Sequence, residues 1–403
     1  MLYRFLAVPV ALAFAGRAVW LRLSGRETGA DLRERLIGPR VFGPAVWVHA
    51  ASVGELNAAR PVIAALAERG RKLLVTATTT TGRDTVRGWA LPGVTAGLAP
   101  LDLPGVTRRM LRAGDIGALV IVENEVWPMR IVACHRMRLP VAMLNARMSA
   151  RSARVWERLP RLARRVFGPM ALVAPQDDGT AERLAALGVR ADALVLPPVN
   201  LKALYLPATT VPHPGFNDVA RSDVVLAAAT HEGEDAAVLS AFGAARAVRP
   251  GLRLIVAPRH PARGTAAAEL PRAAGFAVTR RGAGEAPGAD VYVADTLGEM
   301  DGWYAAAGTV FVGGSLVDKG GHTPFEPLAH GCAVLHGPHV RNFAAPYAAL
   351  DAAGGAVSVA DAAALGAALA DAGALAEVAR RAQGVFPPVD IAPLLARLRG
   401  LLR

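Results

Sequence analysis

The most informative stretch of the chain, residues 318–326, combines a glycine-rich turn with a carboxylate. It follows an apolar run at 309–315 that predicts a buried strand. A strand that leads through glycines into a helix gathers backbone N–H groups at one point, which is one way that proteins hold phosphate. Glu326 falls about one turn into the predicted helix, where its carboxylate can reach sugar hydroxyls. A tight turn with a helix-stabilising first-turn Glu explains this stretch equally well when it is taken alone.

The first half of the chain offers three carboxylates for proton transfer. Glu55 lies behind a Gly-containing loop at 49–54, where a predicted strand turns into a helix, so it can act as a general base towards a hydroxyl. Spacing alone slightly favours an ordinary first-turn Glu at this position. Glu123 and Glu125 alternate at the end of another predicted strand and therefore face opposite sides. We expect Glu125, next to Trp127, to enter the site and Glu123 to hold structure.

Three basic residues lie where they can meet a phosphate. Arg259 directly follows a predicted strand and can grip a phosphate with two hydrogen bonds, although a salt bridge to the neighbouring domain is the alternative. Lys202 follows a Pro-Pro pair and can place its charge against a departing phosphate, with a solvated hinge lysine equally compatible. Only three lysines occur, and Lys319 in the glycine turn is one of them. A compact ammonium there is suited to an anion.

Four histidines in the second half raise the question of a metal. Their spacing matches no zinc pattern, and no Asp-x-Asp pair is present to hold a metal–diphosphate. The four are His322, His330, His336 and His339. We expect no metal site.

Short β-rich runs alternate with amphipathic stretches from residue 45 onward, which predicts parallel sheets with helical crossovers. A first set of strands is expected at 45–50, 72–78, 118–122, 141–144, 171–174 and 193–196, with helices at 55–69, 127–138 and 180–187. After a Pro-rich break, a second set is expected at 224–228, 252–257, 276–279, 291–294, 309–312 and 333–335. We therefore predict an α/β protein with two Rossmann-like domains, 24–199 and 216–403, joined by a linker at 200–215. Because ligands bind beyond the carboxyl ends of such strands, the polar loops of both edges predict a cleft between the domains.

The amino terminus predicts a membrane anchor at residues 1–23. Its uncharged run from Phe5 to Gly16 would span about 18 Å as a helix. That is short of a hydrocarbon core of about 30 Å, but flanking residues extend it. A cleaved signal peptide is the alternative, because Ala13 and Ala15 resemble a cleavage site. We prefer an uncleaved anchor that lies at or across one membrane.

Charge and composition point to an anionic partner. The 403 residues are 53% hydrophobic and carry a formal net charge of +12, so a well-buried globular protein with a basic surface is expected. Aromatic residues make up only 5%, which weakens the case for nucleic acid, and an anionic membrane or a phosphorylated substrate explains the charge as well. Arginines at helical spacing can form one basic stripe, unless Pro160 interrupts it: Arg147, Arg151, Arg154, Arg158 and Arg161. Two cysteines exclude a disulfide framework.

The polar loops, taken together and in order, resemble the 3-deoxy-manno-octulosonic acid (Kdo) transferases of lipopolysaccharide assembly. The matching segments run from the N-terminal region to beyond residue 343: residues 49–55, 123–128, 145–149, 200–202, 258–261, 295–299 and 313–339. The resemblance implies a metal-independent, inverting glycosyltransferase of the two-Rossmann (GT-B) type that needs no cofactor. It also implies CMP-Kdo as donor, a lipid A precursor as acceptor, and a place on the cytoplasmic face of the bacterial inner membrane.

The same resemblance assigns roles to individual residues. It implies that Glu55 is the catalytic base and that Glu125 and Lys202 support the transition state. It implies contacts to CMP from Pro258 and Arg259, from Leu297, Gly298 and Glu299, and from Thr323, Pro324, Phe325 and Glu326. Thr323 and Phe325 stand where the family usually has Asn and Leu, so a hydroxyl would replace an amide in one contact. The alternatives are a GT-B transferase or epimerase acting on a UDP-sugar and, more distantly, a basic nucleic-acid-binding protein.

Overall fold

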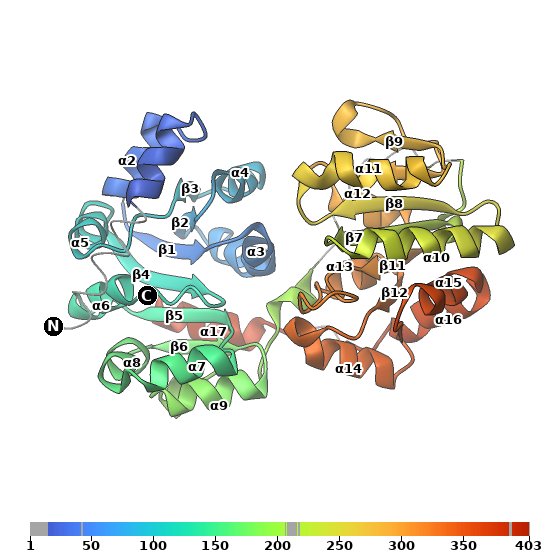
Figure 1. Cartoon of the computed structure of the whole chain (residues 1–403). Coiled ribbons are helices and arrows are strands. Elements are labelled where there is room, and N and C mark those ends of the chain that lie inside the picture. Colours follow the sequence, from blue (N-terminus) through green and yellow to red (C-terminus); the bar gives the residue numbers. More distant parts are fainter. Residues whose placement is uncertain are drawn as a thin grey trace. The chain divides into compact units, whose positions relative to one another are not determined.

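The computed structural model describes residues 15–41, 43–205, 207, 216, 218–386 and 389–402. The chain divides into two compact units, the first made of Met1–Leu204 with Pro388–Arg403 and the second of Tyr205–Pro387. Each unit is a parallel sheet with helices on both faces (Figure 1). This confirms the predicted α/β fold with two Rossmann-like units, whereas the predicted cleft between them stays a prediction.

The first unit holds a six-stranded parallel sheet in the order β3-β2-β1-β4-β5-β6. Its strands are β1 (Ala45–Ala50), β2 (Lys72–Ala77), β3 (Val94–Leu98), β4 (Ile116–Val122), β5 (Val141–Ala146) and β6 (Leu172–Pro175). Alternate residues of β1 fill the two cores, because Val46 and Val48 face one helical layer and Trp47 faces the other. Strand order reverses between β1 and β4, which makes the space beyond their carboxyl ends the expected ligand site of this sheet.

Helices cover both faces of the first sheet. They are α2 (Gly29–Ile37), α3 (Val53–Ala67), α4 (Thr80–Gly88), α5 (Pro104–Ala113), α6 (Pro128–Arg136), α7 (Ala150–Glu157), α8 (Pro160–Phe167), α9 (Asp178–Ala186) and α17 (Ala392–Leu401), with short 3₁₀ turns η1 (Ala191–Ala193) and η2 (Leu201–Leu204). The α3 helix begins where the Ser52 hydroxyl accepts the N–H of Glu55. That cap places Glu55 in the first turn, directly beyond β1.

The second unit holds a seven-stranded parallel sheet in the order β13-β12-β11-β7-β8-β10-β9. Its strands are β7 (Val224–Thr230), β8 (Arg253–Pro258), β9 (Val278–Arg280), β10 (Val291–Val293), β11 (Thr309–Val312), β12 (Ala333–His336) and β13 (Ala356–Ser358). Strand order reverses between β7 and β11, so the loops after these two strands meet at the switch point of the sheet.

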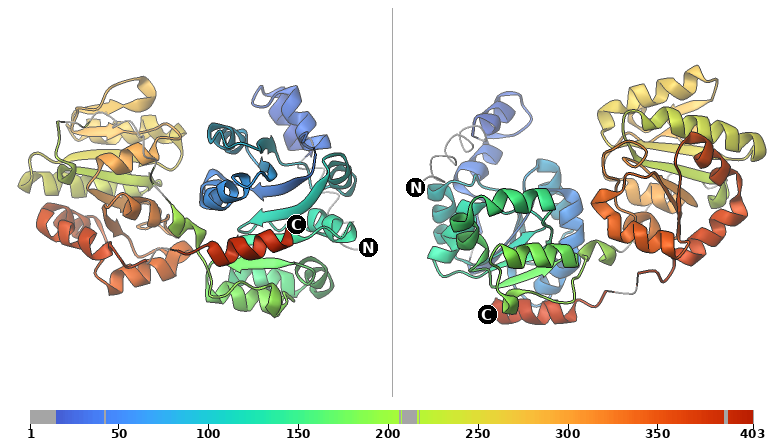
Figure 2. Two further views of the ribbon diagram at one scale, coloured as in Figure 1. Left: turned by 180° about the vertical axis from the view of Figure 1, so that it is seen from behind. Right: turned by 60° about the horizontal axis from the view of Figure 1, so that its bottom comes forward.

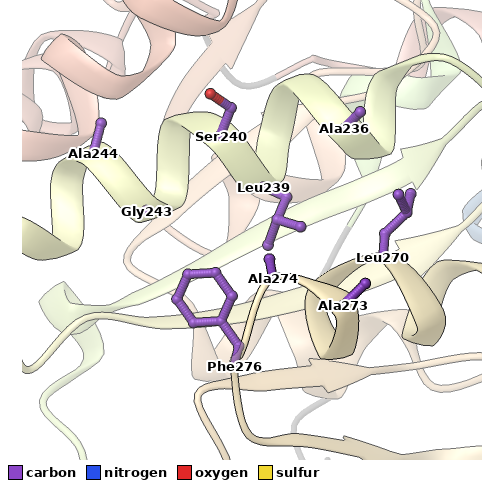
Figure 3. A pocket seen from close by; sticks show the side chains of 9 residues that line it. All are labelled: Ala236, Leu239, Ser240, Gly243, Ala244, Leu270, Ala273, Ala274 and Phe276. Carbon is purple, nitrogen blue, oxygen red and sulfur yellow. The ribbon is translucent and has the colours of Figure 1, made fainter.

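Seven helices of the second unit pack on its sheet within the described part of the chain. They are α10 (Glu234–Val248), α11 (Gly264–Ala273), α12 (Met300–Ala306), α13 (Phe325–Ala329), α14 (Ala344–Ala352), α15 (Ala362–Ala370) and α16 (Ala372–Ala382), with 3₁₀ turns η3 (Arg221–Asp223), η4 (Pro261–Arg263), η5 (Arg281–Ala283) and η6 (Arg341–Phe343). A hollow of about 540 Å³ between α10 and α11 is lined by Leu239, Leu270, Phe276 and small residues (Figure 3). These come from the middle of α10, the C-terminal half of α11 and the segment that follows it, not from the carboxyl-end loops.

Three sequence predictions differ from the structure. The second domain was expected to run to residue 403, yet α17 packs on the first unit (Figure 2, in red). Its residues Leu394, Leu395 and Leu398 are part of the core of that unit. The strand expected at 193–196 is a 3₁₀ turn followed by a single bridge to β6. The edge strands β3 and β13 were not expected, because both are short and partly exposed and lack a long apolar run.

The described part of the predicted N-terminal anchor, residues 15–23, is helical, and residues 1–14 lie outside the described residues. Within the described ranges no single helix is long and apolar enough to cross a membrane. Only α15 and α16, bent by 92° at the break between them, pass that test as a pair.

Candidate active site

Three carboxylates come together at the switch point of the first sheet. Glu55 follows β1, Glu123 and Glu125 follow β4, and β1 and β4 are paired in parallel, so all three leave the same edge. The charges of Glu123 and Glu125 both act on Glu55. The sequence prediction that these loops converge therefore holds within the first unit.

Glu55 is set up to exchange a proton near neutral pH. Burial, followed by the charges of Glu123 and Glu125, raises the pKa of its carboxyl to about 7, against the opposing effect of the Ala51 N–H. That N–H donates to Glu55 Oε2 at 2.7 Å and fixes the direction of the carboxylate. The side chain remains partly exposed. A positioned carboxyl with a pKa near 7 is suited to act as a general base.

Glu125 is a fixed hydrogen-bond acceptor. Its Oε2 accepts from Trp127 Nε1 at 2.7 Å and from His49 Nε2 at 3.1 Å. Burial raises the pKa of Glu125, but the hydrogen bonds and the nearby positive charge outweigh it and leave the pKa lowered. Burial and the charge of Arg130 lower the pKa of His49 to about 4, so its ring is neutral at pH 7. With Nε2 donating to Glu125, His49 Nδ1 accepts from the Thr76 hydroxyl at 3.0 Å.

A buried arginine supports this arrangement. The guanidinium carbon of Arg130 lies 4.7 Å from the centre of the Trp47 ring, and the side chain is almost fully buried. Asp102 accepts the backbone N–H groups of Met129 at 3.1 Å and Arg130 at 2.7 Å, which fixes the start of α6 beside Glu125. The charge of Arg130 is among the causes that lower the pKa of Glu125. Arg130 therefore adds a smaller effect to the hydrogen bonds from His49 and Trp127 that keep Glu125 ionised.

Lys202 is held within the same cluster by Glu123. Its Nζ lies 2.6 Å from Glu123 Oε1, and Glu123 is buried. Asn145 links both ends of this pair, because its Nδ2 donates to Glu123 at 3.2 Å and its Oδ1 accepts the Leu201 N–H at 2.9 Å. Glu123 and Asn145 both have positive φ, 54° and 49°. Such strained backbone at strand ends is common at functional sites and needs firm support from its surroundings.

A second polar cluster lies at the switch point of the second sheet. The buried carboxylate of Glu234 accepts the N–H groups of His231, Gly314, Ser315 and Leu316 at 2.7–2.9 Å. This fixes the turn after β11 against the end of β7, where His231 begins the next loop. The loop of residues 318–323 follows, as the glycine-rich pattern predicted.

The predicted nucleotide contacts lie at this edge of the second unit. Pro258 ends β8, and the exposed Arg259 donates its N–H to Thr230 O at 3.0 Å. Leu297 is 65% exposed in the loop before α12. Glu299 accepts from Arg281 Nη2 at 2.6 Å and pairs with the Thr296 hydroxyl, while Gly298 has φ of 85°.

The helix that begins within the stretch 323–326 is shorter than expected. Thr323 Oγ1 accepts the Phe325 N–H at 3.3 Å, and α13, which Pro324 precedes, has only five residues, so its dipole is small. The Phe325 ring packs in the core against Phe386, with centroids 5.0 Å apart. Glu326 lies in the first turn, as predicted. Its carboxylate is close to the buried Tyr304 hydroxyl, whose pKa is raised by burial and by the charge of Glu326.

The four histidines that raised a metal question do not converge. His330 pairs with Asp301 at 3.1 Å and His336 with Asp351 at 3.0 Å. Across the described ranges, no group of three or more His, Cys, Asp or Glu side chains is placed to hold a metal ion.

Comparison with known proteins identifies the family. The profile of a family described as 3-deoxy-D-manno-octulosonic-acid transferase (kdotransferase) matches residues 30–203. The 3-deoxy-D-manno-octulosonic acid transferase of Bordetella pertussis is 37% identical over 385 residues, which cover 87% of each chain. The chain belongs to the 3-deoxy-D-manno-octulosonic acid transferase family. The predicted family and glycosyltransferase activity in lipopolysaccharide assembly are thereby confirmed.

Other relatives agree with this assignment or with the fold. The Kdo transferase of Haemophilus influenzae is 34% identical and covers 74% of this chain and 71% of its own. The UDP-GlcNAc 2-epimerase of Neisseria meningitidis, solved with UDP-GlcNAc bound, has a TM-score of 0.61 at 14% identity and covers 89% of this chain and 99% of its own. At that identity the epimerase shows the fold alone.

Some residues of the Kdo transferase site were missed from sequence. His49 and Asn145 were seen only as members of strand-end loops, and their pairing with Glu125 and Glu123 depends on which strands are neighbours. Arg130, inside the helix α6, and Glu234, in the first turn of α10, gave no signal beyond their charge. A buried charge becomes recognisable only when the core around it is known.

Proposed function

We propose that this Kdo transferase moves Kdo from CMP-Kdo to a primary hydroxyl of a lipid A precursor, with inversion at the anomeric carbon. The observation that carries the proposal is Glu55, a positioned carboxyl with a pKa of about 7 at the switch point of the first sheet. The names of the relatives at 37% and 34% identity support the transferred sugar.

In this mechanism Glu55 removes the proton of the acceptor hydroxyl as it attacks the anomeric carbon. A base with a pKa near 7 is about half ionised near neutral pH and still strong enough to take the proton. The negative charges of Glu123 and Glu125 act on Glu55 and favour its protonated form. They therefore stabilise Glu55 once it has taken the proton from the acceptor.

Glu125 and Lys202 support the transition state in different ways. Glu125, fixed by Trp127 and His49, offers a rigid negative charge to the oxocarbenium-like sugar. Lys202 brings an ammonium group to the cluster, and its pairing with Glu123 holds it ready without leaving a buried charge uncompensated. As negative charge develops on the departing CMP, the attraction of Lys202 to the phosphate grows.

The second unit supplies the donor site. Glu326 lies where it can accept ribose hydroxyls, with Tyr304 orienting it. Arg259 is exposed next to the turn fixed by Glu234 and can pair with the phosphate. No cofactor is needed, since CMP-Kdo is itself the activated donor.

A lipid acceptor calls for a membrane-facing surface, and α7 with α8 supports one on the first unit. Arg151, Arg154, Arg158 and Arg161 are exposed there, and Val155 and Leu159 lie among them, 54% and 37% exposed. Pro160 does interrupt the predicted stripe by starting α8. Basic side chains around exposed apolar ones suit an anionic bilayer such as the cytoplasmic face of the bacterial inner membrane, with the N-terminal segment as an anchor.

The product decides the function. Purified protein is incubated with lipid A precursor and freshly made CMP-Kdo, and separately with UDP-GlcNAc or UDP-glucose, and the lipid is analysed by mass spectrometry. We expect a mass increase of one or more Kdo residues with CMP-Kdo only. A hexose adduct, or epimerisation of the UDP-sugar without a lipid product, would replace the proposal with the UDP-sugar alternative.

A further inference from the structure

Three histidines lie together at the carboxyl edge of the second sheet, outside the residues assigned above. His231 follows β7, His260 follows β8, and His322 lies in the loop of residues 318–323 after β11. The Nε2 atoms of His231 and His322 are 3.1 Å apart, and the two rings are nearly parallel, at 4° with centroids 5.4 Å apart. The ring of His260 lies almost perpendicular to that of His231 at 6.3 Å. A Cβ on Gly314 would come within 3.2–3.4 Å of both paired rings, so glycine leaves them room.

The contact between His231 and His322 limits how many protons they hold. At 3.1 Å one Nε2 must donate and the other accept, so the neutral pair already shares one proton between these atoms. One further proton can go to an Nδ1 with the contact intact, which makes a shared monocation. A second added proton would have to go to the accepting Nε2, which would set two N–H groups face to face. The two rings therefore titrate as one unit that gains a single charge.

The surroundings oppose that charge until an anion arrives. Arg259, His260 and Lys319 are the positive or titratable groups that act on the pair, and Glu234 is the acidic one. The Glu234 carboxylate, held by four backbone N–H groups, raises the pKa of His231, but burial and the neighbouring positive charges outweigh it and leave that pKa lowered. Burial, then the charges of Arg259 and the other rings, lowers the pKa of His322 to about 4. The same edge carries the proposed nucleotide contacts, because His260 follows Arg259 and His322 precedes Thr323.

We propose that the His231–His322 pair takes up one proton when the phosphate group of the donor binds, and that it holds this positive charge while CMP departs. The inference rests on the proposed function. During transfer the bond from the anomeric carbon to the phosphate oxygen breaks and its electron pair stays on that oxygen. The acceptor proton goes to Glu55. The second negative charge of CMP then meets the charged pair, and release of CMP returns the proton of the pair to solvent.

Calorimetry with the full chain tests the proposal. The probe is the methyl ester of CMP, a phosphodiester with one permanent negative charge, so any linked proton belongs to the protein. Titrations at pH 6.5 in two buffers of different ionisation enthalpy measure proton uptake. We expect uptake of about 0.3 to 1 proton per ester bound, and an affinity that falls by up to about tenfold per pH unit as the pH rises through the pKa of the bound pair.

Two histidine variants test whether the proton that is taken up is held by the His231–His322 pair. His231→Asn and His322→Asn keep a polar side chain that does not titrate, and each is expected to abolish the uptake and flatten the pH dependence. Lys319→Gln is the matched control. It removes a nearby cation that acts on the pair only through its charge and leaves both rings in place, so it should weaken binding and leave the uptake in place. Circular dichroism checks that each variant is folded.

The outcomes separate this inference from the proposed function. Binding of the ester by the wild-type chain without proton uptake overturns the inference and leaves the function standing, whatever the variants do. Uptake that persists in both histidine variants also overturns it, because the proton is then held elsewhere. Failure of CMP and the ester to bind, together with no turnover of CMP-Kdo, removes the proposed function itself.

Discussion

Changing the charge beside Glu55 should move the pH dependence of the reaction in a predictable direction. Wild-type kcat/KM should rise with pH through an acid limb near the Glu55 pKa of about 7. In Glu123→Gln one negative charge is removed and the ion pair with Lys202 is lost, and both changes favour the ionised form of Glu55. In Lys202→Met the opposite holds, because Glu123 is left without its cation and repels an ionised Glu55 more strongly.

The expected shift of the acid limb follows from the relative size of the effects on the pKa of Glu55. Burial contributes most to the pKa of Glu55 and the Glu123 charge less, so Glu123→Gln should lower the acid limb by about half to one pH unit. At pH 5.5, kcat/KM relative to its own plateau should then be about three- to eightfold higher than in wild type. The plateau itself should fall in both variants, since each disturbs Lys202.

The assay is the pH profile of kcat/KM from pH 5 to 9 with CMP-Kdo and a lipid A precursor, run beside thermal melting of each variant. Asn145 can still donate to Gln at position 123, so the backbone of the strand end is expected to stay in place. The assignment of Glu55 as the titrating base would be refuted if the acid limb moved in the same direction in Glu123→Gln and Lys202→Met. It would also be refuted if the acid limb moved in neither variant.

Three further predictions concern the supports of the site. Glu234→Gln turns an amide N–H towards backbone N–H groups such as that of Gly314, and should destabilise the second unit by about 2–3 kcal/mol and weaken CMP binding; unchanged melting would contradict this. Leu398→Ala, at a fully buried position of α17, should lower the free energy of unfolding of the first unit by about 2–5 kcal/mol and spare the CMP-stabilised transition in calorimetry. A shift of the CMP-stabilised transition instead would place α17 with the second unit. Tyr304→Phe should weaken CMP binding by about three- to tenfold through loss of its contact with Glu326, with kcat nearly unchanged; a loss confined to kcat would argue against that role.

Sequence predicts this fold well where strands are buried on both faces. Such strands read as short apolar runs, and β1, β4 and β11 were found within a few residues because of it. Edge strands lack that pattern. In β3 the glycine at position 97 faces Pro39, which leaves a Cβ no room, so a packing requirement interrupts the run. The partner of α17 was missed for another reason, since an amphipathic helix does not encode which core it covers.

The candidate site likewise has parts that the sequence predicts and parts that it does not. The rule that ligands bind beyond the carboxyl ends of parallel strands brought the loops of Glu55 and Glu125 together, but Glu123 was expected to face the opposite side, whereas its charge acts on Glu55 beside that of Glu125. The pairs that tune them were not predictable, because His49 and Glu125 lie 76 residues apart and meet only through the β1–β4 pairing. Glu123 was expected to hold structure, and it does so by holding Lys202.

The most direct test of the account compares turnover and nucleotide binding in Glu55→Gln. Glu55 lies in the first unit and the proposed nucleotide contacts lie in the second, so the two properties should separate. We expect kcat with CMP-Kdo and lipid A precursor to fall by about 10²- to 10⁴-fold, while the affinity for CMP by calorimetry stays within about twofold of wild type. Turnover near the wild-type rate in a folded Glu55→Gln variant would contradict the central claim that this carboxyl group is the base.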